Sequence, residues 1–162
     1  MNFIGMEKDA VIEGNYRYLL KRKWDVKKPQ ITFVMLNPSI ADAYQDDPTL
    51  RKCISFAKSW DYGFLEVVNL FAYRATNPRE LNQVVDPVGL KNNYYIELAT
   101  KSAALIIVAW GTKGSMKNQD KEVLNLISAK QPLYCLGLTK YGHPRHPLYV
   151  KRSTEAIIFS ST

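Results

Sequence analysis

The sequence predicts an α/β fold, a three-layer α/β/α sandwich with a mainly parallel central sheet. Four short apolar runs of strand length alternate with segments whose apolar residues recur at helical spacing, the pattern of parallel strands joined by crossover helices. The 162 residues suit one domain, and no linker, repeat or low-complexity stretch divides them. We therefore expect a single domain over residues 1–162.

The first strands of the sheet are expected near the N-terminus. Residues 16–24 alternate imperfectly between apolar and basic side chains, which suits a half-exposed strand. After a turn at 25–29, residues 31–36 are uniformly apolar apart from one threonine and predict a strand buried on both faces. We expect the two to pair antiparallel, with 16–24 as an edge strand protected by its lysines and arginines.

An acidic loop follows the second of these strands. Asn37, Pro38 and Ser39 end the strand, and residues 41–48 lead to a helix predicted over 50–60, whose apolar residues share one face. Asp46, Asp47 or Thr49 is expected to cap this helix. For the two aspartates, capping is favoured over catalysis on this pattern alone.

The middle of the chain repeats the strand and helix alternation. Residues 64–71 predict a second buried strand, and a loop at 72–78 follows it. Asp86 precedes Pro87, a capping residue before a proline at the first helical position, so a helix is predicted over 88–101.

The last third continues this pattern. Residues 104–109 predict a third buried strand that ends in Trp110 and Gly111, residues 115–130 a helix, and 133–137 a fourth strand. The tail from 153 to 162 is too short to assign.

Both histidines lie in the loop after the fourth strand. His143 and His146 are each followed by proline, which fixes φ and removes a backbone donor, so residues 142–149 predict a rigid loop. Ligands of α/β sheets bind outside the carboxyl ends of the strands, which is where this loop would lie. The alternative is a surface loop of two turns with solvated histidines.

Each predicted buried strand ends in residues suited to a binding crevice. Asparagine amides match the amide-like edge of a nucleobase, and histidine can donate to a carbonyl or to charge developing on a departing group. The alternatives are an Asx-turn at Asn37, backbone pairing by Asn69 and core packing by Trp110. The expected ligand-binding residues are Asn37, Pro38, Ser39, Asn69, Arg74, Trp110, Gly111, His143 and His146.

The positive charge is concentrated near these histidines. The formal net charge is +7, and no Asp or Glu occurs from Val123 to Thr154. We expect a nucleic acid or nucleotide partner, with phosphate contacts from Arg145, Lys151 and Arg152; a solvated basic face is the alternative. A second basic cluster near the start consists of Arg17, Lys21, Arg22, Lys23, Lys27 and Lys28.

Other classes of protein fit less well. Two histidines without a third ligand at readable spacing argue against zinc, and no glycine-rich phosphate loop or serine elbow is present. Cys53 and Cys135 lie in apolar patterns and are expected to be buried thiols. No apolar run is long enough to span a bilayer, and the first nine residues lack signal-peptide features. We expect a cytoplasmic protein without metal, cofactor or membrane.

The ordered motifs resemble a known family. Leu-Asn-Pro-Ser at 36–39, Asn-Leu-Phe-Ala-Tyr-Arg-Ala-Thr at 69–76, Ala-Trp-Gly at 109–111 and Gly-His-Pro-Arg-His-Pro-Leu-Tyr at 142–149 resemble the uncharacterised bacterial and phage family catalogued as domain of unknown function sixteen-forty-three. That family in turn resembles the uracil-DNA glycosylase superfamily, which has a Gly-x-Asn-Pro motif in its mismatch-specific branch and His-Pro-Ser-Pro-Leu in its classical branch.

The resemblance implies a uracil-DNA-glycosylase-like fold and a role for several residues. Asn37 would position water, Asn69 would read the base, and Trp110-Gly111 would close the third strand. His146 or His143 would stabilise the departing base, and Leu148 would wedge into the duplex. The chain departs from the pattern in two places: Leu36 precedes Asn-Pro, and Arg145 interrupts the last motif.

These observations favour a nucleobase-recognising protein. The first hypothesis is an N-glycosylase-like hydrolase acting on a modified or deaminated base in nucleic acid. The second is a non-catalytic nucleotide or nucleic-acid binding module, because asparagine cannot take a proton from water as aspartate can. The third is a hydrolase or transferase of free nucleosides or nucleotides.

Overall fold

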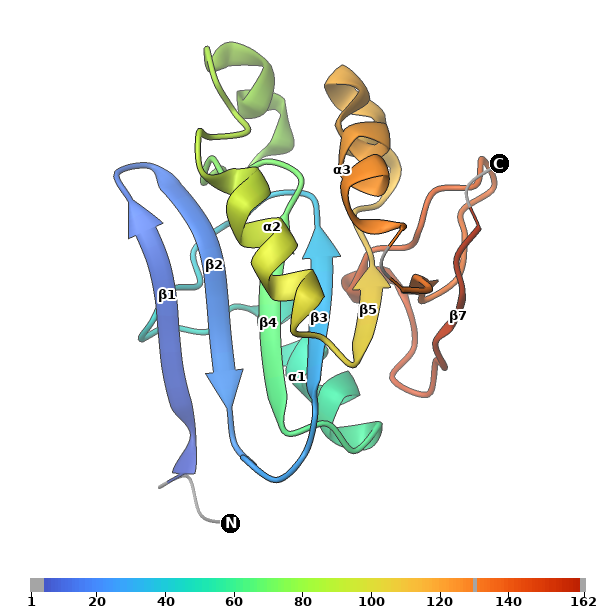
Figure 1. Cartoon of the computed structure of the whole chain (residues 1–162). Coiled ribbons are helices and arrows are strands. Elements are labelled where there is room, and N and C mark those ends of the chain that lie inside the picture. Colours follow the sequence, from blue (N-terminus) through green and yellow to red (C-terminus); the bar gives the residue numbers. More distant parts are fainter. Residues whose placement is uncertain (1–4, 130, 161–162) are drawn as a thin grey trace.

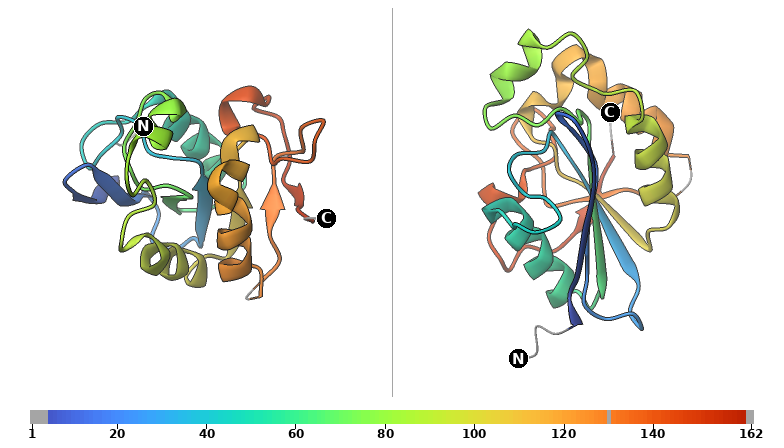
Figure 2. Two further views of the ribbon diagram at one scale, coloured as in Figure 1. Left: turned by 90° about the horizontal axis from the view of Figure 1, so that it is seen from above. Right: turned by 90° about the vertical axis from the view of Figure 1, so that its left-hand side faces the viewer.

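A seven-stranded sheet with helices on both faces forms the domain (Figures 1 and 2). The computed structural model describes residues 5–129 and 131–160. The strand order is β1-β2-β4-β3-β5-β6-β7, and the four strands from β4 to β6 are parallel. The strands are β1 (Glu7–Glu13), β2 (Tyr16–Lys23), β3 (Gln30–Met35), β4 (Phe64–Asn69), β5 (Leu105–Val108), β6 (Tyr134–Cys135) and β7 (Ile157–Ile158).

The helices form the two outer layers. Helix α1 (Pro48–Ser59) covers one face, and α2 (Asn92–Lys101) and α3 (Gln119–Ile127) cover the other (Figure 2). Alternate residues of the central strands feed two separate cores: Phe33 packs on the α1 side and Val34 on the α2 side. The predicted three layers are present. Short 3-10 helices are η2 (Pro78–Gln83), η3 (Thr112–Asn118) and η4 (Pro147–Tyr149).

The predicted pairing of the first strand is wrong. Strand β2 pairs antiparallel with β4, not with β3, and β1 pairs with its other side. It is therefore an interior strand, and β1 occupies the edge. The sheet is mixed rather than mainly parallel, because β1, β2 and β7 add antiparallel pairings to the parallel centre. In β2, Arg17 is 3% exposed and Arg22 is fully buried, so neither belongs to a solvated basic face.

Two predicted helices begin later than expected. The carboxylate of Asp86 accepts from the Gly89 N–H at 3.1 Å, and Gly89 has φ +91°, so a turn delays α2 to Asn92. Lys117 and Asn118 have φ near +55°, which separates η3 from α3. The last residue predicted for that helix, Lys130, lies outside the described residues.

The last predicted strand is shorter than expected. Within residues 133–137, only β6 pairs in the sheet. The unassigned tail supplies β7 (Figure 1), which runs antiparallel to β6.

The order of the parallel strands locates the place where a ligand can bind. Strand β3 is followed by β4 on one side, whereas β5 pairs on its other side and leads to β6. The chain therefore leaves the carboxyl ends of β3 and β5 in opposite directions. Such a switch point opens a crevice at the sheet edge.

Candidate functional site

A pocket of about 470 Å³ lies at this switch point. Its volume is within the range of small-molecule sites. Asn37 and Ser39 enter it from the segment after β3, Trp110 and Gly111 from the segment after β5, and His146 from the loop after β6. Residues widely separated in the sequence thus meet in one place, as the strand-end argument predicted.

The predicted site residues divide into two groups. Those that line the pocket are Asn37, Ser39, Trp110, Gly111, His146 and Leu148. Those outside its lining are Pro38, Asn69, Arg74, His143, Arg145, Lys151 and Arg152.

The loop that carries His146 is hydrogen-bonded to residues just after β5 and β6. The Gly111 N–H donates to the Pro144 carbonyl at 2.8 Å, and the Arg145 N–H donates to the Gly137 carbonyl at 2.9 Å. Gly111 has φ +75°, a conformation that glycine adopts without strain. These bonds join the loop to the segments that follow β5 and β6, while its rigidity stays a prediction from its two prolines.

His146 is half-buried and presents a neutral imidazole. Its Nδ1 accepts from the Leu148 N–H at 3.2 Å, so the proton of the neutral ring lies on Nε2. Burial lowers the pKa of His146, and the nearby Asp47 carboxylate opposes this shift. His146 can therefore donate one hydrogen bond from Nε2 at neutral pH.

The side-chain amide nitrogen of Asn37 is hydrogen-bonded within the fold. Its Nδ2 donates to the Ala75 carbonyl at 2.7 Å and to the Pro38 carbonyl at 3.0 Å. The amide oxygen of Asn37 is therefore the atom suited to a ligand or to water. Arg74, predicted to bind ligand, instead donates to the Ser39 and Ile40 carbonyls, both at 3.2 Å, and shapes the loop beside Asn37.

Asn69 lies beneath the pocket. It ends β4, pairs in register with Met35, and shares its face of the sheet with Met35 and Val67, which both line the pocket. Asn69 is 1% exposed, and neither of its side-chain polar atoms has a hydrogen-bond partner among the described residues. An unsatisfied buried amide on this face is unusual for a group that only fills the core.

Trp110 lines the pocket and also packs in the core. It is 2% exposed and packs edge-on against Phe159, with 6.2 Å between ring centroids. A Cβ built at Gly114 would lie 2.1 Å from Trp110 Cδ1, so glycine is required where η3 crosses the indole. Core packing, the alternative considered for Trp110, is therefore part of its role.

Two buried charged residues that the sequence analysis did not assign to the site also line the pocket. Asp47 caps α1 as predicted, since its Oδ1 accepts from the Leu50 N–H at 2.8 Å, and it faces the pocket as well. Arg17 is the second. Burial lowers the pKa of Arg17 to about 10, although Asp47 acts against this shift, and the guanidinium stays charged at neutral pH.

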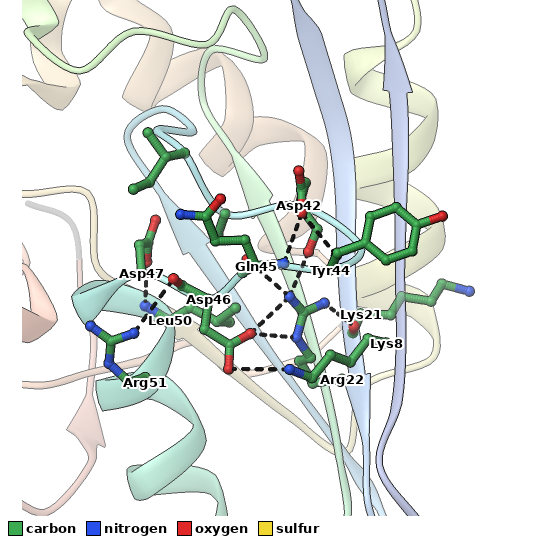
Figure 3. A network of polar contacts seen from close by, with 12 residues as sticks. Lys8, Lys21, Arg22, Asp42, Tyr44, Gln45, Asp46, Asp47, Leu50 and Arg51 are labelled. Atoms are coloured by element: carbon green, nitrogen blue, oxygen red, sulfur yellow. Dashed lines mark hydrogen bonds and ion pairs between the residues drawn. The ribbon is translucent and has the colours of Figure 1, made fainter.

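A separate polar network holds the acidic loop (Figure 3). Arg22 donates from Nε to Asp46 at 3.0 Å, from Nη1 to the Lys21 carbonyl at 2.8 Å, and from Nη2 to the Asp42 carbonyl. Figure 3 also shows the bond from Asp47 to the first turn of α1, at Leu50. The network therefore fixes the segment that delivers Asp47 to the pocket.

Among the described residues, no group of three or more His, Cys, Asp or Glu side chains could hold a metal ion. No helix in the described part of the chain is long and apolar enough to cross a membrane.

Comparison with known proteins identifies one family. Residues 17–148 match the model of the family DUF1643, described as a protein of unknown function. No curated protein and no solved structure matches the chain. The matched segment contains every pocket residue named above and extends from β2 to Leu148 in η4. The chain therefore belongs to the DUF1643 family.

Proposed function

We propose that this chain is an N-glycosylase-like hydrolase that acts on a modified or deaminated base in nucleic acid, with a fold similar to that of the uracil-DNA glycosylase superfamily. One observation carries the proposal: a neutral histidine donor, His146, and a carboxylate, Asp47, line the same pocket as Asn37. These are the groups that an N-glycosidic hydrolysis needs.

The proposed reaction uses water as the nucleophile. The Asn37 amide oxygen orients a water molecule, whose oxygen forms a bond to the anomeric carbon of the sugar. The bond from this carbon to the base nitrogen breaks, and its electron pair leaves with the base. The Nε2–H of His146 donates to an oxygen of the base on which charge develops. Asp47 accepts the proton that water loses, a role for which asparagine is unsuited.

A substrate within a nucleic acid is supported by the mouth of the pocket. Leu148 and Tyr149 are 44% and 79% exposed and also line the pocket. Exposed apolar and aromatic side chains can replace or stack on neighbouring bases when one base is flipped out of the strand. The basic segment that contains Arg145, Lys151 and Arg152 adjoins these residues in the sequence.

The test is base release. Single-stranded and double-stranded oligonucleotides that carry uracil, hypoxanthine or another altered base are incubated with the protein and scored for abasic sites and free base. We expect release from at least one substrate. Binding without release would leave the binding-module alternative. Neither binding nor release, in oligonucleotides or free nucleosides, would refute the proposal.

A second candidate function is hydrolysis or transfer on free nucleosides or nucleotides. It is favoured because Lys113 lines the pocket, whereas Arg145, Lys151 and Arg152 do not. Salt dependence separates the candidates. Oligonucleotide binding should weaken with a log–log slope of about −0.7 to −0.9 for each neutralised phosphate, and charge reversal at Arg145 and Lys151 should flatten it. A flat dependence for the unmodified chain favours free nucleotides.

A further inference from the structure

A β-bulge turns one arginine toward the pocket. In the pairing of β1 with β2, Val11 lies opposite Leu19 and Ile12 opposite Arg17, so Tyr18 is an extra residue in β2. Tyr18 stacks on Tyr95 of α2 with 5.6 Å between ring centroids, on the face away from the pocket. Bulges redirect side chains and are frequent beside active sites.

Arg17 is consequently buried with a donor unused. The residue lines the pocket together with Leu20, which regular alternation over three residues would have placed on the opposite face. Its Nη1 donates to the Ala41 carbonyl at 2.9 Å, but its buried Nε–H has no hydrogen-bond partner among the described residues. Leaving a charged donor unsatisfied in the interior destabilises the fold. A ligand that accepts this hydrogen bond removes the penalty.

The surroundings of Arg17 indicate the chemistry of that ligand atom. Asp47 lines the same pocket and lies close enough to influence the charge of Arg17, yet the ion pairs found among the described residues do not join the two. Its negative charge balances the guanidinium and repels a phosphate dianion. Leu20 and Val67 supply apolar walls that suit a flat ring. A neutral carbonyl oxygen on a ring satisfies both conditions.

We propose that Arg17 is a specificity-determining residue, which donates from Nε to a ring carbonyl oxygen of the bound base and so selects keto bases against amino bases. An amino group at the same position would place a donor against the Nε–H, which would stay unsatisfied, and the amino group would lose its hydrogen bond to water. The inference rests on the proposed function, because it assigns the base selectivity of the same pocket.

The test is a pair of matched ligands. The 5′-monophosphates of deoxyuridine and deoxycytidine differ at ring position 4, a carbonyl oxygen against an amino group, and at the neighbouring N3, which carries a proton only in the keto base; both carry the same phosphate. Titration calorimetry of the full chain should give at least tenfold tighter binding of the keto ligand, because a mispaired buried polar group excludes an analogue strongly. In Arg17→Met, binding of the keto ligand should fall at least tenfold and the preference should disappear.

The controls separate charge, folding and phosphate. Lys23→Met removes a positive charge from the same strand, away from the pocket lining, and should keep the preference. Far-ultraviolet circular dichroism establishes that each variant is folded. Inorganic phosphate, used as a competitor, shows whether Arg17 holds the phosphate instead.

Three results would overturn the inference. The unmodified chain could bind both ligands equally, or Arg17→Met could keep the preference for the keto ligand. In the third result, inorganic phosphate no longer competes with the ligands in Arg17→Met, while the preference between the two bases is unchanged. The first needs no variant, so a failure of Arg17→Met to fold does not protect the inference. If base release is observed while the preference is independent of Arg17, the inference fails and the proposed function stands. Absence of both base release and nucleotide binding refutes the function itself.

Discussion

Strand β2 supplies two buried arginines, and each lies near an aspartate of the same acidic loop. Arg22 contacts Asp46 at 2.9 Å, and all three of its guanidinium nitrogens donate to protein oxygens (Figure 3). Arg17 lies near Asp47 without an ion pair, and its Nε–H has no partner among the described residues. Arg22 therefore serves the fold with every guanidinium nitrogen paired, whereas Arg17 lines the pocket with one donor unpaired, which is why we propose that it binds a ligand.

The largest effect is expected at the histidine of the pocket. His146→Ala removes a preorganised donor to the departing base and should raise the activation free energy of base release by about 2–4 kcal/mol, while ligand affinity changes less. Single-turnover kinetics and calorimetric binding measure the two quantities.

His143→Ala is the matched control, because His143 belongs to the same loop but lies outside the pocket lining. It should release base at the rate of the unmodified chain. Equal rates for both variants and the unmodified chain would make the whole loop structural.

We expect substitution of Arg22 to lower the free energy of unfolding rather than the rate of base release. Arg22→Met leaves the Asp42 and Gln45 carbonyls without their buried partner and isolates Asp46. The free energy of unfolding should fall by about 3 kcal/mol, from the loss of several charge-assisted hydrogen bonds. Urea denaturation followed by circular dichroism measures it. A change under 1 kcal/mol, on the order of one ordinary hydrogen bond, would contradict a structural role for this network.

Buried strands could be predicted from the sequence, whereas the order of the strands in the sheet could not. Uniform apolar runs such as 31–36 predict buried strands whatever their neighbours. The residues that follow the runs predicted a pocket, which Asn37, Trp110 and His146 line and Asn69, Arg74 and His143 do not. The pairing of β2 was predicted wrongly because strand order depends on contacts distant in the sequence.

Arg17 and Asp47 could not be assigned to the pocket from local patterns. Arg17 reaches it through a bulge at Tyr18, which breaks the alternation on which strand predictions rest. Asp47 was predicted as a helix cap, and one carboxylate oxygen does cap α1. Its second role depends on where α1 lies against the sheet. Strand β1 was not predicted, because most of its side chains are exposed or half-buried and mixed in polarity.

A smaller effect is expected in the pH dependence of stability. Burial lowers the pKa of His146 below its ordinary 6.5. As pH falls below about 6.5, His146 binds a proton in the unfolded chain but not yet in the folded chain. The free energy of unfolding therefore decreases until His146 is protonated in the folded state as well. His146→Gln should lose this part of the decrease. Urea denaturation at pH 7 and pH 5.5 for both chains measures the difference, and an identical decrease in both would contradict a buried neutral imidazole.

The central claim is that Asp47 serves the chemistry and Asp46 serves the fold. Its most direct test compares the rates of base release of two folded variants, Asp47→Asn and Asp46→Asn. Asparagine is as good a helix cap as aspartate, so Asp47→Asn should keep the fold and lose about 10²- to 10⁴-fold in rate, the contribution of a general base. Asp46→Asn should retain the rate of the unmodified chain and lose stability instead. Equal rates for both variants, or a greater loss of rate in Asp46→Asn, would contradict the assignment of Asp47 to chemistry and of Asp46 to the fold.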